Sequence, residues 1–410
     1  MNNQTITLVI VMLTYVGVAI GFIPRLRTNR TIIALLGVGI LLLFQQITVS
    51  DIPGFLDIDT LVLLFSMMVI NANLRLAGFF KLTGGYLLRL TRKPRVFLAI
   101  EIVVVGVLSA LFLNDTICIM FTPFLLELLL AIDRDPIPYL IALATSANIG
   151  SVATLTGNPQ NMIVGSASGI GYTQFLGELG PISLLCLGIV WVVIVLMYKR
   201  EFSATNFFII PPTQRVSYYK PLLIKSIAVV VGMVIAFLVG IPVSLASFIA
   251  ASVLLITRRT KPEKIFAGID WGILVFFSAL FILTGSLDKN QVTSMLLNTF
   301  NISGKENVLN LSVVTTALSN LVSNVPAVLL MKPLITSMNQ PTAGWLTLAA
   351  SSTLAGNLTL LGSVANLIVA ESAKRHQVDL TFWEYTKSGL IITILTLAIS
   401  TTWLFFFVWK

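Results

Sequence analysis

Residues 154–164 read TLTGNPQNMIV, and residues 359–369 read TLLGSVANLIV. Both segments fit the pattern Thr-Leu-x-Gly-(Asn/Ser)-x-x-Asn-x-Ile-Val, and each interrupts an apolar run that is long enough to span a membrane. Backbone freed by such a break is tolerated at membrane depth only where protein buries it or a watery cavity borders it. Two broken helices in corresponding places therefore indicate the binding site of a transporter.

The composition indicates an all-α polytopic membrane protein. Hydrophobic residues make up 56% of the 410 residues and charged residues 10%, against about 25% charged in an ordinary soluble domain. The net charge is +9, but the basic residues fall in short clusters between apolar runs, as the positive-inside rule predicts. We therefore expect a lipid bilayer and no nucleic acid as partner. Cys118 and Cys186 lie in separate apolar runs and predict no disulfide.

The first half of the chain, residues 1–198, contains five expected spans and one hairpin. Basic residues follow the first span and acidic residues follow the second, which places these loops in the cytoplasm and outside, respectively. The expected spans are about 5–23, 31–49, 60–80, 137–167 (broken) and 179–198, and the hairpin is about 96–132.

The hairpin at about 96–132 turns at Asn114, Asp115 and Thr116. If Glu101 and Glu127 mark the interface, each arm reaches about 18 Å into a core of roughly 30 Å, and the tip stops near the midplane. This geometry favours a re-entrant hairpin over two full spans. The alternative for Glu101 is a buried functional acid.

The second half, residues 222–410, repeats this order after a polar cytoplasmic linker at 199–221. An Ile-Asp-x-x-x-Leu-x-Phe pattern opens the third span of both halves, at residues 58–65 and 269–276. Five spans are an odd number, so the second half begins on the opposite side and the repeats are inverted. Both termini are then external. The expected elements are spans at about 222–239, 242–257, 271–287 and 386–408, a hairpin at about 307–337 and a broken helix at about 343–372.

The two hairpin tips and the two breaks are expected to meet at the midplane and to form the binding site. Half-helix N-termini attract anions there, and carbonyls at C-terminal ends hold cations. Each asparagine taken singly also fits a helix–helix hydrogen bond; their matched positions favour a site, with Asn161 and Asn366 acting on it from opposite halves. The candidate binding residues are Asn114, Asp115, Thr116, Thr154, Gly157, Asn158, Asn161, Ser323, Asn324, Thr359, Gly362, Ser363 and Asn366.

Asp115 breaks the symmetry of the two tips, because Val325 follows Asn324 at the equivalent place. A carboxylate inside the membrane is costly and usually marks a site or finds a partner. We expect Asp115 to hold a coupling proton or cation, and a sodium ion near Asn114, Asp115 and Gly157 is one candidate. The alternative is that Asp115 caps the second arm of its own hairpin.

The chain resembles the ion transporter superfamily of dicarboxylate and citrate carriers, arsenite permeases and sodium/proton antiporters. Residues 113–116, LNDT, and 147–161, ANIGSVATLTGNPQN, are similar to the arsenite-permease and citrate-transporter-like branch. The resemblance implies a homodimer and a transport domain of hairpins and broken helices that moves as an elevator. The dicarboxylate branch carries Ser-Asn-Thr at both tips, a pattern that neither Asn114-Asp115-Thr116 nor Ser323-Asn324-Val325 keeps.

These observations predict a secondary active transporter of a small anion, coupled to protons or sodium and located in the cell membrane. The rival functions within the same superfamily are arsenite or antimonite efflux and cation/proton antiport. The chain has no P-loop motif of an ATP-driven pump and no recognisable nucleophile and base of an enzyme. No cofactor is expected beyond H⁺ or Na⁺ as coupling ion.

Overall fold

The computed structural model describes residues 3–21, 26, 28–203, 218–256, 261–292 and 307–409, without the side chains of 87–90. All regular elements among these residues are helices. Eight of them, α1, α4, α6, α7, α10, α11, α14 and α20, are long and apolar enough to cross a membrane. Arg215 and Asn301, which the sequence places in the cytoplasm and outside, respectively, lie outside the described residues.

The helices of the first half are α1 Asn3–Ile20, α2 Arg30–Leu43, η1 Val49–Asp51, α3 Ile52–Phe55, α4 Ile58–Ala77, α5 Phe79–Leu90, α6 Pro94–Leu111, α7 Asn114–Ala131, α8 Ile137–Ser151, α9 Pro159–Ser168 and α10 Tyr172–Met197. Those of the second half are α11 Lys220–Leu238, α12 Val243–Leu255, α13 Pro262–Phe266, α14 Trp271–Lys289, α16 Val308–Val322, α17 Asn324–Thr336, α18 Pro341–Ala355, η3 Leu360–Gly362, α19 Val364–Arg375 and α20 Phe382–Phe407.

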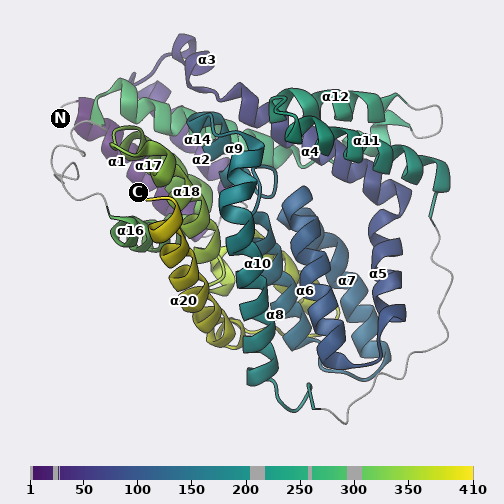
Figure 1. Ribbon diagram of the computed structural model, residues 1–410. Helices are drawn as coiled ribbons and strands as arrows, with labels where there is room; N and C mark the ends of the chain where they lie inside the picture. The colour runs from purple at the N-terminus through teal and green to yellow at the C-terminus, as the bar shows by residue number, and fades with distance from the viewer. Residues whose placement is uncertain are drawn as a thin grey trace.

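The helices form two groups (Figure 1). One group runs along the top of the view and contains α1, α2, α4, α11, α12 and α14, with α2 packed on α14 and α12 on α4. The other group contains the paired arms α6–α7 and α16–α17 together with the interrupted helices α8–α9 and α18–α19. In this group α6 packs on α8, α16 packs on α18, and α10 packs on α20. The contacts α6–α8 and α16–α18 correspond to one another, as do α2–α14 and α12–α4, and α10 and α20 are the equivalent last helices of the two halves.

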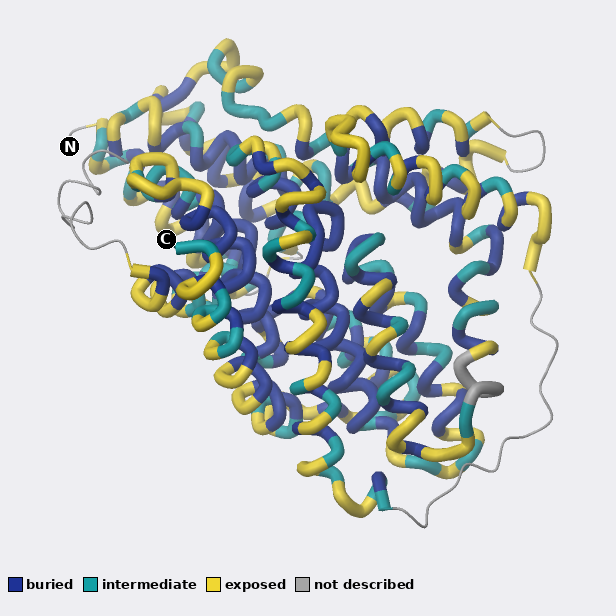
Figure 2. The backbone as a smooth tube through the Cα atoms, viewed as in Figure 1, coloured by how far each residue is buried: buried dark blue, intermediate teal, exposed yellow. Residues whose placement is uncertain are grey.

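Burial follows this arrangement, because the helices of the second group turn buried faces toward one another and exposed faces outward (Figure 2). Every residue of α8 from Pro138 to Ser151 is buried, and so is every residue of α18 from Ala343 to Ala355. A helix that is apolar or small all round belongs in a protein interior. The first segments of the two interrupted helices therefore form the centre of the molecule.

The second helix ends earlier than the sequence predicted. The apolar run extends to residue 49, but α2 ends at Leu43 because Gln45 adopts a left-handed conformation with a φ of 53°. The N–H of Gln46 bonds to the carbonyl of Leu41 at 2.9 Å, and that of Gln45 to Leu42 at 3.0 Å. This pair of bonds is a Schellman closure, which satisfies the last carbonyls of a helix.

The arms of the first hairpin, α6 and α7, meet at Phe112 and Leu113. The tip is fixed to the first break, since the N–H of Asn114 donates to the carbonyl of Gly157 at 3.0 Å. Glu101 does not mark an interface, because its side chain is fully buried, whereas Glu127 on the opposite arm is exposed. Burial inside the protein agrees with the alternative of a buried acid, and the arm length estimated from Glu101 stays a prediction.

Helices α6 and α8 pack so closely that their glycines touch. A Cβ atom added at Gly150 would lie 2.2 Å from the carbonyl oxygen of Gly106 on α6, whereas one added at Gly188 on α10 would meet nothing within 4 Å. Backbone atoms at this distance must move apart to admit a methyl group. Contacts of small residues that let helix backbones approach are typical of membrane helix pairs.

We expect Gly150→Ala to lower the free energy of unfolding by about 1–3 kcal/mol or more, because the added methyl group overpacks the contact. Gly188→Ala should leave stability unchanged or slightly raise it, since alanine favours helix. Thermal unfolding of both purified variants in detergent measures the difference. Equal melting temperatures would show that the α6–α8 contact is loose.

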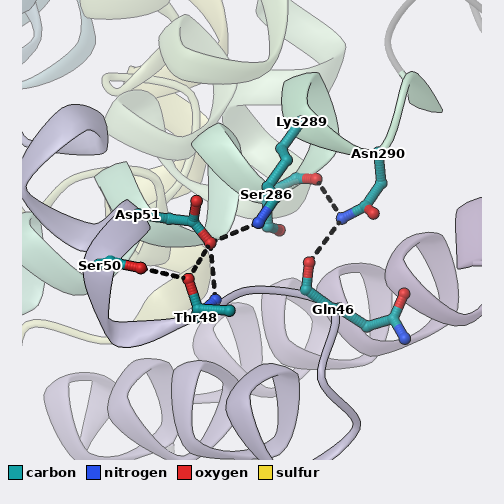
Figure 3. A network of polar contacts seen from close by, with 7 residues as sticks. All are labelled: Gln46, Thr48, Ser50, Asp51, Ser286, Lys289 and Asn290. Carbon is teal, nitrogen blue, oxygen red and sulfur yellow. Dashed lines mark hydrogen bonds and ion pairs between the residues drawn. The ribbon is translucent and has the colours of Figure 1, made fainter.

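A polar network joins the α2–α4 connection to the end of α14 (Figure 3). A carboxylate oxygen of Asp51 accepts a hydrogen bond from the ammonium of Lys289. The same oxygen accepts from the N–H and from the hydroxyl of Thr48, and both of these bonds are 2.7 Å long. The side chain of Asn290 donates to the carbonyl of Gln46 at 3.1 Å. The bond from Lys289, followed by those from Thr48, lowers the pKa of Asp51 to about 2.

A folded-state pKa below the ordinary value means that Asp51 stabilises the fold above pH 3.8 and loses this effect as the pH falls toward about 2. We expect Asp51→Asn to lower the melting temperature at neutral pH and to match the unsubstituted protein near pH 2. Asp379→Asn, at an exposed carboxylate, is the control. A difference that persists undiminished at the lowest pH would contradict this assignment.

Candidate functional site

A cavity of about 410 Å³ lies where the two groups of helices meet. Its lining combines residues of both hairpin tips and both breaks with residues of α2 and α14. The polar lining residues are Asn29, Arg30, Thr31, Asn114, Asp115, Gln160, Asp270, Ser323, Asn324 and Ser363. The cavity therefore carries two carboxyl groups, one guanidinium group and a set of neutral donors and acceptors.

A smaller cavity of about 100 Å³ shares Asp115, Pro159 and Asp270 with the larger one. Asn71 and Thr116 also line it, and the amide of Asn71 donates to the hydroxyl of Thr116 at 3.1 Å. Asp115 and Asp270 therefore border both cavities, one from the first hairpin tip and one from the start of α14.

Helix N-termini surround the larger cavity. Most of the residues that line it stand at or directly before the first turns of α2, α7, α9, α14, α17 and α19; Gly21, Phe276 and Phe277 do not. The backbone N–H groups of a first helical turn have no partner within the helix, and the positive end of the helix dipole lies there. This convergence favours negative charge, or the oxygen atoms of a polar solute, inside the cavity.

Asn148 of α8 connects the two breaks beneath the cavity. Its side-chain amide donates to the side-chain oxygens of Asn357 at 2.9 Å and Asn366 at 3.0 Å. Its side-chain oxygen accepts from Asn114 and from Ser363, each at 3.0 Å. Asn148 thus makes all four hydrogen bonds that its amide group can make, and it holds the first hairpin tip against the second break.

Asn161 and Asn366 have the same role in their own breaks. The side-chain amide of Asn161 donates to the carbonyls of Ser151 at 3.0 Å and Thr154 at 2.9 Å. That of Asn366 donates to the carbonyls of Gly356 at 2.7 Å and Thr359 at 3.0 Å. These carbonyls are the ones that the interruption of each helix leaves free, so both asparagines fold the break rather than line the cavity.

The first break also rests on the second half of the chain. The amides of Asn158 and Gln160 donate to the hydroxyl of Thr353 on α18 at 3.3 Å and 3.2 Å. Asn158 also caps α9, because its side-chain oxygen accepts from the N–H of Asn161 at 2.8 Å. Each break therefore packs on the first segment of the other interrupted helix, with Thr353 in the position that Asn148 holds opposite.

The predicted site residues divide between the cavity and its support. Thr116 lines the smaller cavity, and Gly157 and Gly362 sit so close to the carbonyls of Ser151 and Gly356 that a Cβ would lie 2.5 Å and 2.9 Å away. The residues that line the larger cavity are Asn114, Asp115, Ser323, Asn324 and Ser363. Those in the supporting breaks are Thr154, Gly157, Asn158, Asn161, Thr359, Gly362 and Asn366.

The oxygens considered for sodium already accept backbone hydrogen bonds. The carbonyl of Gly157 accepts from the N–H of Asn114, and the side-chain oxygen of Asn114 accepts from the N–H of Asp115 at 2.9 Å. Each such oxygen has a second lone pair. A cation that used the oxygens of Gly157 and Asn114 would therefore share them with the N–H groups of the hairpin tip.

Ser323 stands at the second tip with a φ of 80° and a ψ of 159°, a region that non-glycine residues rarely adopt. This conformation turns the chain between α16 and α17 and lets both Ser323 and Asn324 line the cavity. Backbone strain of this kind clusters at functional sites.

Several polar residues of the site escaped the sequence analysis as ligands, Asn29 and Thr31 of the α2 start among them. Arg30 served there as a marker of the cytoplasmic side, and Asp270 as part of the repeated pattern that opens a span. Asp270 caps α14 through the N–H of Ile273 at 3.1 Å and also lines both cavities. Asn148 and Gln160 stood within the motif of residues 147–161, but their long-range partners have no signal in one sequence.

A chain of membrane-spanning helices with two interrupted helices around a polar cavity belongs to the class of transporters. The family described as citrate transporter matches residues 8–355. The chain therefore belongs to the citrate transporter family, a family of secondary transporters within the ion transporter superfamily, as the resemblance implied. It is a transporter and not an enzyme.

Relatives of known name fall within the same group. The silicon efflux transporter LSI3 of Oryza sativa subsp. japonica is 33% identical, and the match covers 92% of each chain. The putative transporter arsB of Dictyostelium discoideum is 25% identical and covers 92% of this chain and 87% of its own. The crystal structure of the Alcanivorax borkumensis YdaH transporter has a TM-score of 0.61 at 14% identity, with 98% of each chain covered. The similarity to the YdaH structure confirms the all-helical, multi-span fold.

Replacing Asn148 by alanine should destabilise the centre of the protein. The substitution leaves buried groups of Asn114, Asn357 and Asn366 without their partner, at about 1–3 kcal/mol for each group that stays unsatisfied. Asn73→Ala is the control, since that amide donates to the carbonyl of Val69 on its own helix at 2.9 Å. Thermal unfolding in detergent compares the two. A smaller loss for Asn148→Ala than for the control would contradict the central role of this residue.

Proposed function

We propose that this chain is a secondary active transporter of a small oxygen-rich anion, with the cavity of about 410 Å³ as the substrate site. The observation that carries the proposal is the convergence of helix N-termini and Arg30 on one cavity. The positive ends of helix dipoles and a guanidinium group together bind carboxylate, phosphate-like or other oxyanions. The side-chain amides of Asn114 and Asn324 add donors that fit oxygen atoms.

Asp115 is the proposed coupling residue. It lines the cavity beside the second carboxyl group, that of Asp270, so an anion meets two negative charges unless a proton or a cation neutralises them. Binding of substrate and binding of the coupling ion therefore assist one another. A proton on Asp115 or a sodium ion beside it would each satisfy this condition.

The proposed movement is that of an elevator. In this proposal the hairpins and the broken helices form the transport domain, and the helices α1, α2, α4, α11, α12 and α14 form the scaffold. The matched packing of the two halves supports inverted repeats, 1–198 and 222–410, with both termini external and the linker at 199–221 cytoplasmic. The family resemblance adds a homodimer to this proposal.

A second candidate substrate is an undissociated oxyacid. The relative named a silicon efflux transporter covers nearly the whole chain, and the two carboxyl groups of the cavity, Asp115 and Asp270, accept hydrogen bonds from hydroxyl groups. Arsenite or antimonite efflux belongs to the same category of cargo. The two candidate substrates differ in charge, since the oxyacid is neutral and the oxyanion is negative.

Proteoliposome flux tests the proposal with citrate, phosphate, silicic acid and arsenite, each with and without pH and sodium gradients. Arg30→Gln should reduce the flux of a charged substrate at low concentration by about tenfold or more, because a hydrogen bond to a charged group contributes about 1.5–3 kcal/mol. The flux of an undissociated acid should change much less. Absence of gradient-driven flux for every solute would refute the assigned substrate class.

Asp115→Asn should abolish acceleration by a gradient while leaving substrate exchange measurable, because asparagine keeps the size and an acceptor oxygen but does not titrate. Glu127→Gln, at an exposed carboxylate of the same hairpin, is the matched control and should behave as the unsubstituted protein. Gradient-driven accumulation by Asp115→Asn at the unsubstituted level would leave Asp115 with a capping role alone.

A further inference from the structure

Glu101 is a second carboxyl group inside the helix bundle, far along α6 from the hairpin tip. Its side chain is fully buried, and within the described part of the chain neither carboxyl oxygen has a hydrogen-bond partner. A buried carboxyl without a counter-charge is stable in its neutral, protonated form. Glu101 precedes the tip residue Asn114 by as many residues as Leu311 of α16 precedes the tip residue Asn324. The equivalent helix therefore carries a leucine at this position, so helix packing alone does not require an acid.

The phenol of Tyr139 connects this position to the end of the bundle. Phe97, one turn before Glu101 on α6, packs edge-on against the ring of Tyr139 with a centroid distance of 5.8 Å. Glu101 belongs to the same buried face of α6 as Phe97, one turn farther along the helix. On its far side, the hydroxyl of Tyr139 donates to a carboxylate oxygen of Glu201 at 3.0 Å. Tyr139 therefore stands between two acidic side chains.

Glu201 lies after the end of α10 and has access to water. Its side chain is 11% exposed and lies 3.8 Å from the guanidinium of Arg134, itself 17% exposed. Burial raises the pKa of Glu201 above its ordinary value, against the effects of Tyr139 and Arg134. The ring of Phe202 covers Tyr139 at a centroid distance of 5.4 Å, so the phenol itself is closed off from solvent.

The other helices around α6 offer no comparable partner among the described side chains. Helices α5, α7, α8 and α10 pack against it. Lys81 and Tyr86 of α5 and Glu127 of α7 are exposed, and Cys118 of α7 and Cys186 of α10 are buried thiols. Asp115 lies at the hairpin tip, and Tyr172 and Glu178 lie in the first two turns of α10. This leaves Tyr139, which packs on Phe97 one turn from Glu101 and bonds to Glu201, as the group that connects this part of α6 to the end of the bundle.

We propose that Glu101 is an internal proton site of this transporter, loaded and emptied through Tyr139 and Glu201. When the site empties, the Glu101 side chain rotates toward the phenol and its O–H bond breaks as the oxygen of Tyr139 accepts the proton. The original phenol proton passes to Glu201, which releases it to water, and Tyr139 remains neutral. Loading reverses these steps. The role of this site in coupling rests on the proposed function. It extends that function by one proton, in addition to those bound near Asp115.

Infrared difference spectroscopy of the full-length protein in proteoliposomes tests the site without any substrate. We expect a protonated-carboxyl band that is lost in alkaline buffer, absent in Glu101→Gln and retained in Glu127→Gln. After transfer to D₂O, the band should shift about tenfold or more slowly in Tyr139→Phe, which corresponds to about 1.4 kcal/mol of activation free energy. Tyr15→Phe, at a buried tyrosine bonded to Thr284 at 3.0 Å, should exchange at the unsubstituted rate.

A band that is missing, that never titrates, or that exchanges equally fast in Tyr139→Phe overturns the proposal. The Tyr139→Phe measurement keeps Glu101 in place, so it decides the matter even where Glu101→Gln does not fold. In flux experiments, Glu101→Gln should lower the number of protons moved per substrate by one and leave exchange unchanged; an unaltered number also overturns the coupling role. Failure of all substrates with an intact infrared result would instead refute the assigned substrate class.

Discussion

The structure depends on how it satisfies the backbone carbonyls that two interrupted helices leave free. In water these carbonyls would bond to solvent, but inside a membrane protein an unpaired carbonyl costs several kcal/mol. The side chains of Asn161 and Asn366 solve this problem locally, each by donating both N–H bonds of one amide to its own break. Once the breaks are closed in this way, they can hold a polar cavity open between helices that are otherwise buried on all sides.

Much of this architecture follows from patterns within single segments. The paired motifs at 154–164 and 359–369 mark the ends of α8 and α18 correctly, since each motif gathers a glycine and several polar residues within a few positions, a combination that favours a loop. The end of α2 was missed because the Schellman closure at Gln45 is formed by backbone bonds that hydropathy does not register. Glu101 was taken as an interface marker because charge alone does not distinguish a surface carboxylate from a buried acid.

The site was harder to predict, because its members come from helices far apart in sequence. Asn114, Asp115 and Asn324 were recognised since polar residues at a hairpin tip are conspicuous in an apolar run. Arg30 and Asp270 stand at helix ends, where a charge is ordinary, and only the packing of α2 on α14 brings them to the cavity. The sequence therefore identified the hairpin tips of the proposed site better than the part that α2 and α14 contribute.

The network around Asn148 also bears on the ancestry of the chain. Asn148 bonds to the second break through three partners, Asn357, Ser363 and Asn366, whereas Thr353, at the same distance before its own motif, receives two bonds from the first. In a dimer of two identical subunits, the positions equivalent to Asn148 and Thr353 would carry the same residue. Such a symmetric assembly could not have an asparagine at one position and a threonine at the other. For the inverted repeats proposed above, one polypeptide removes that restriction and allows each half to diverge in complement to the other.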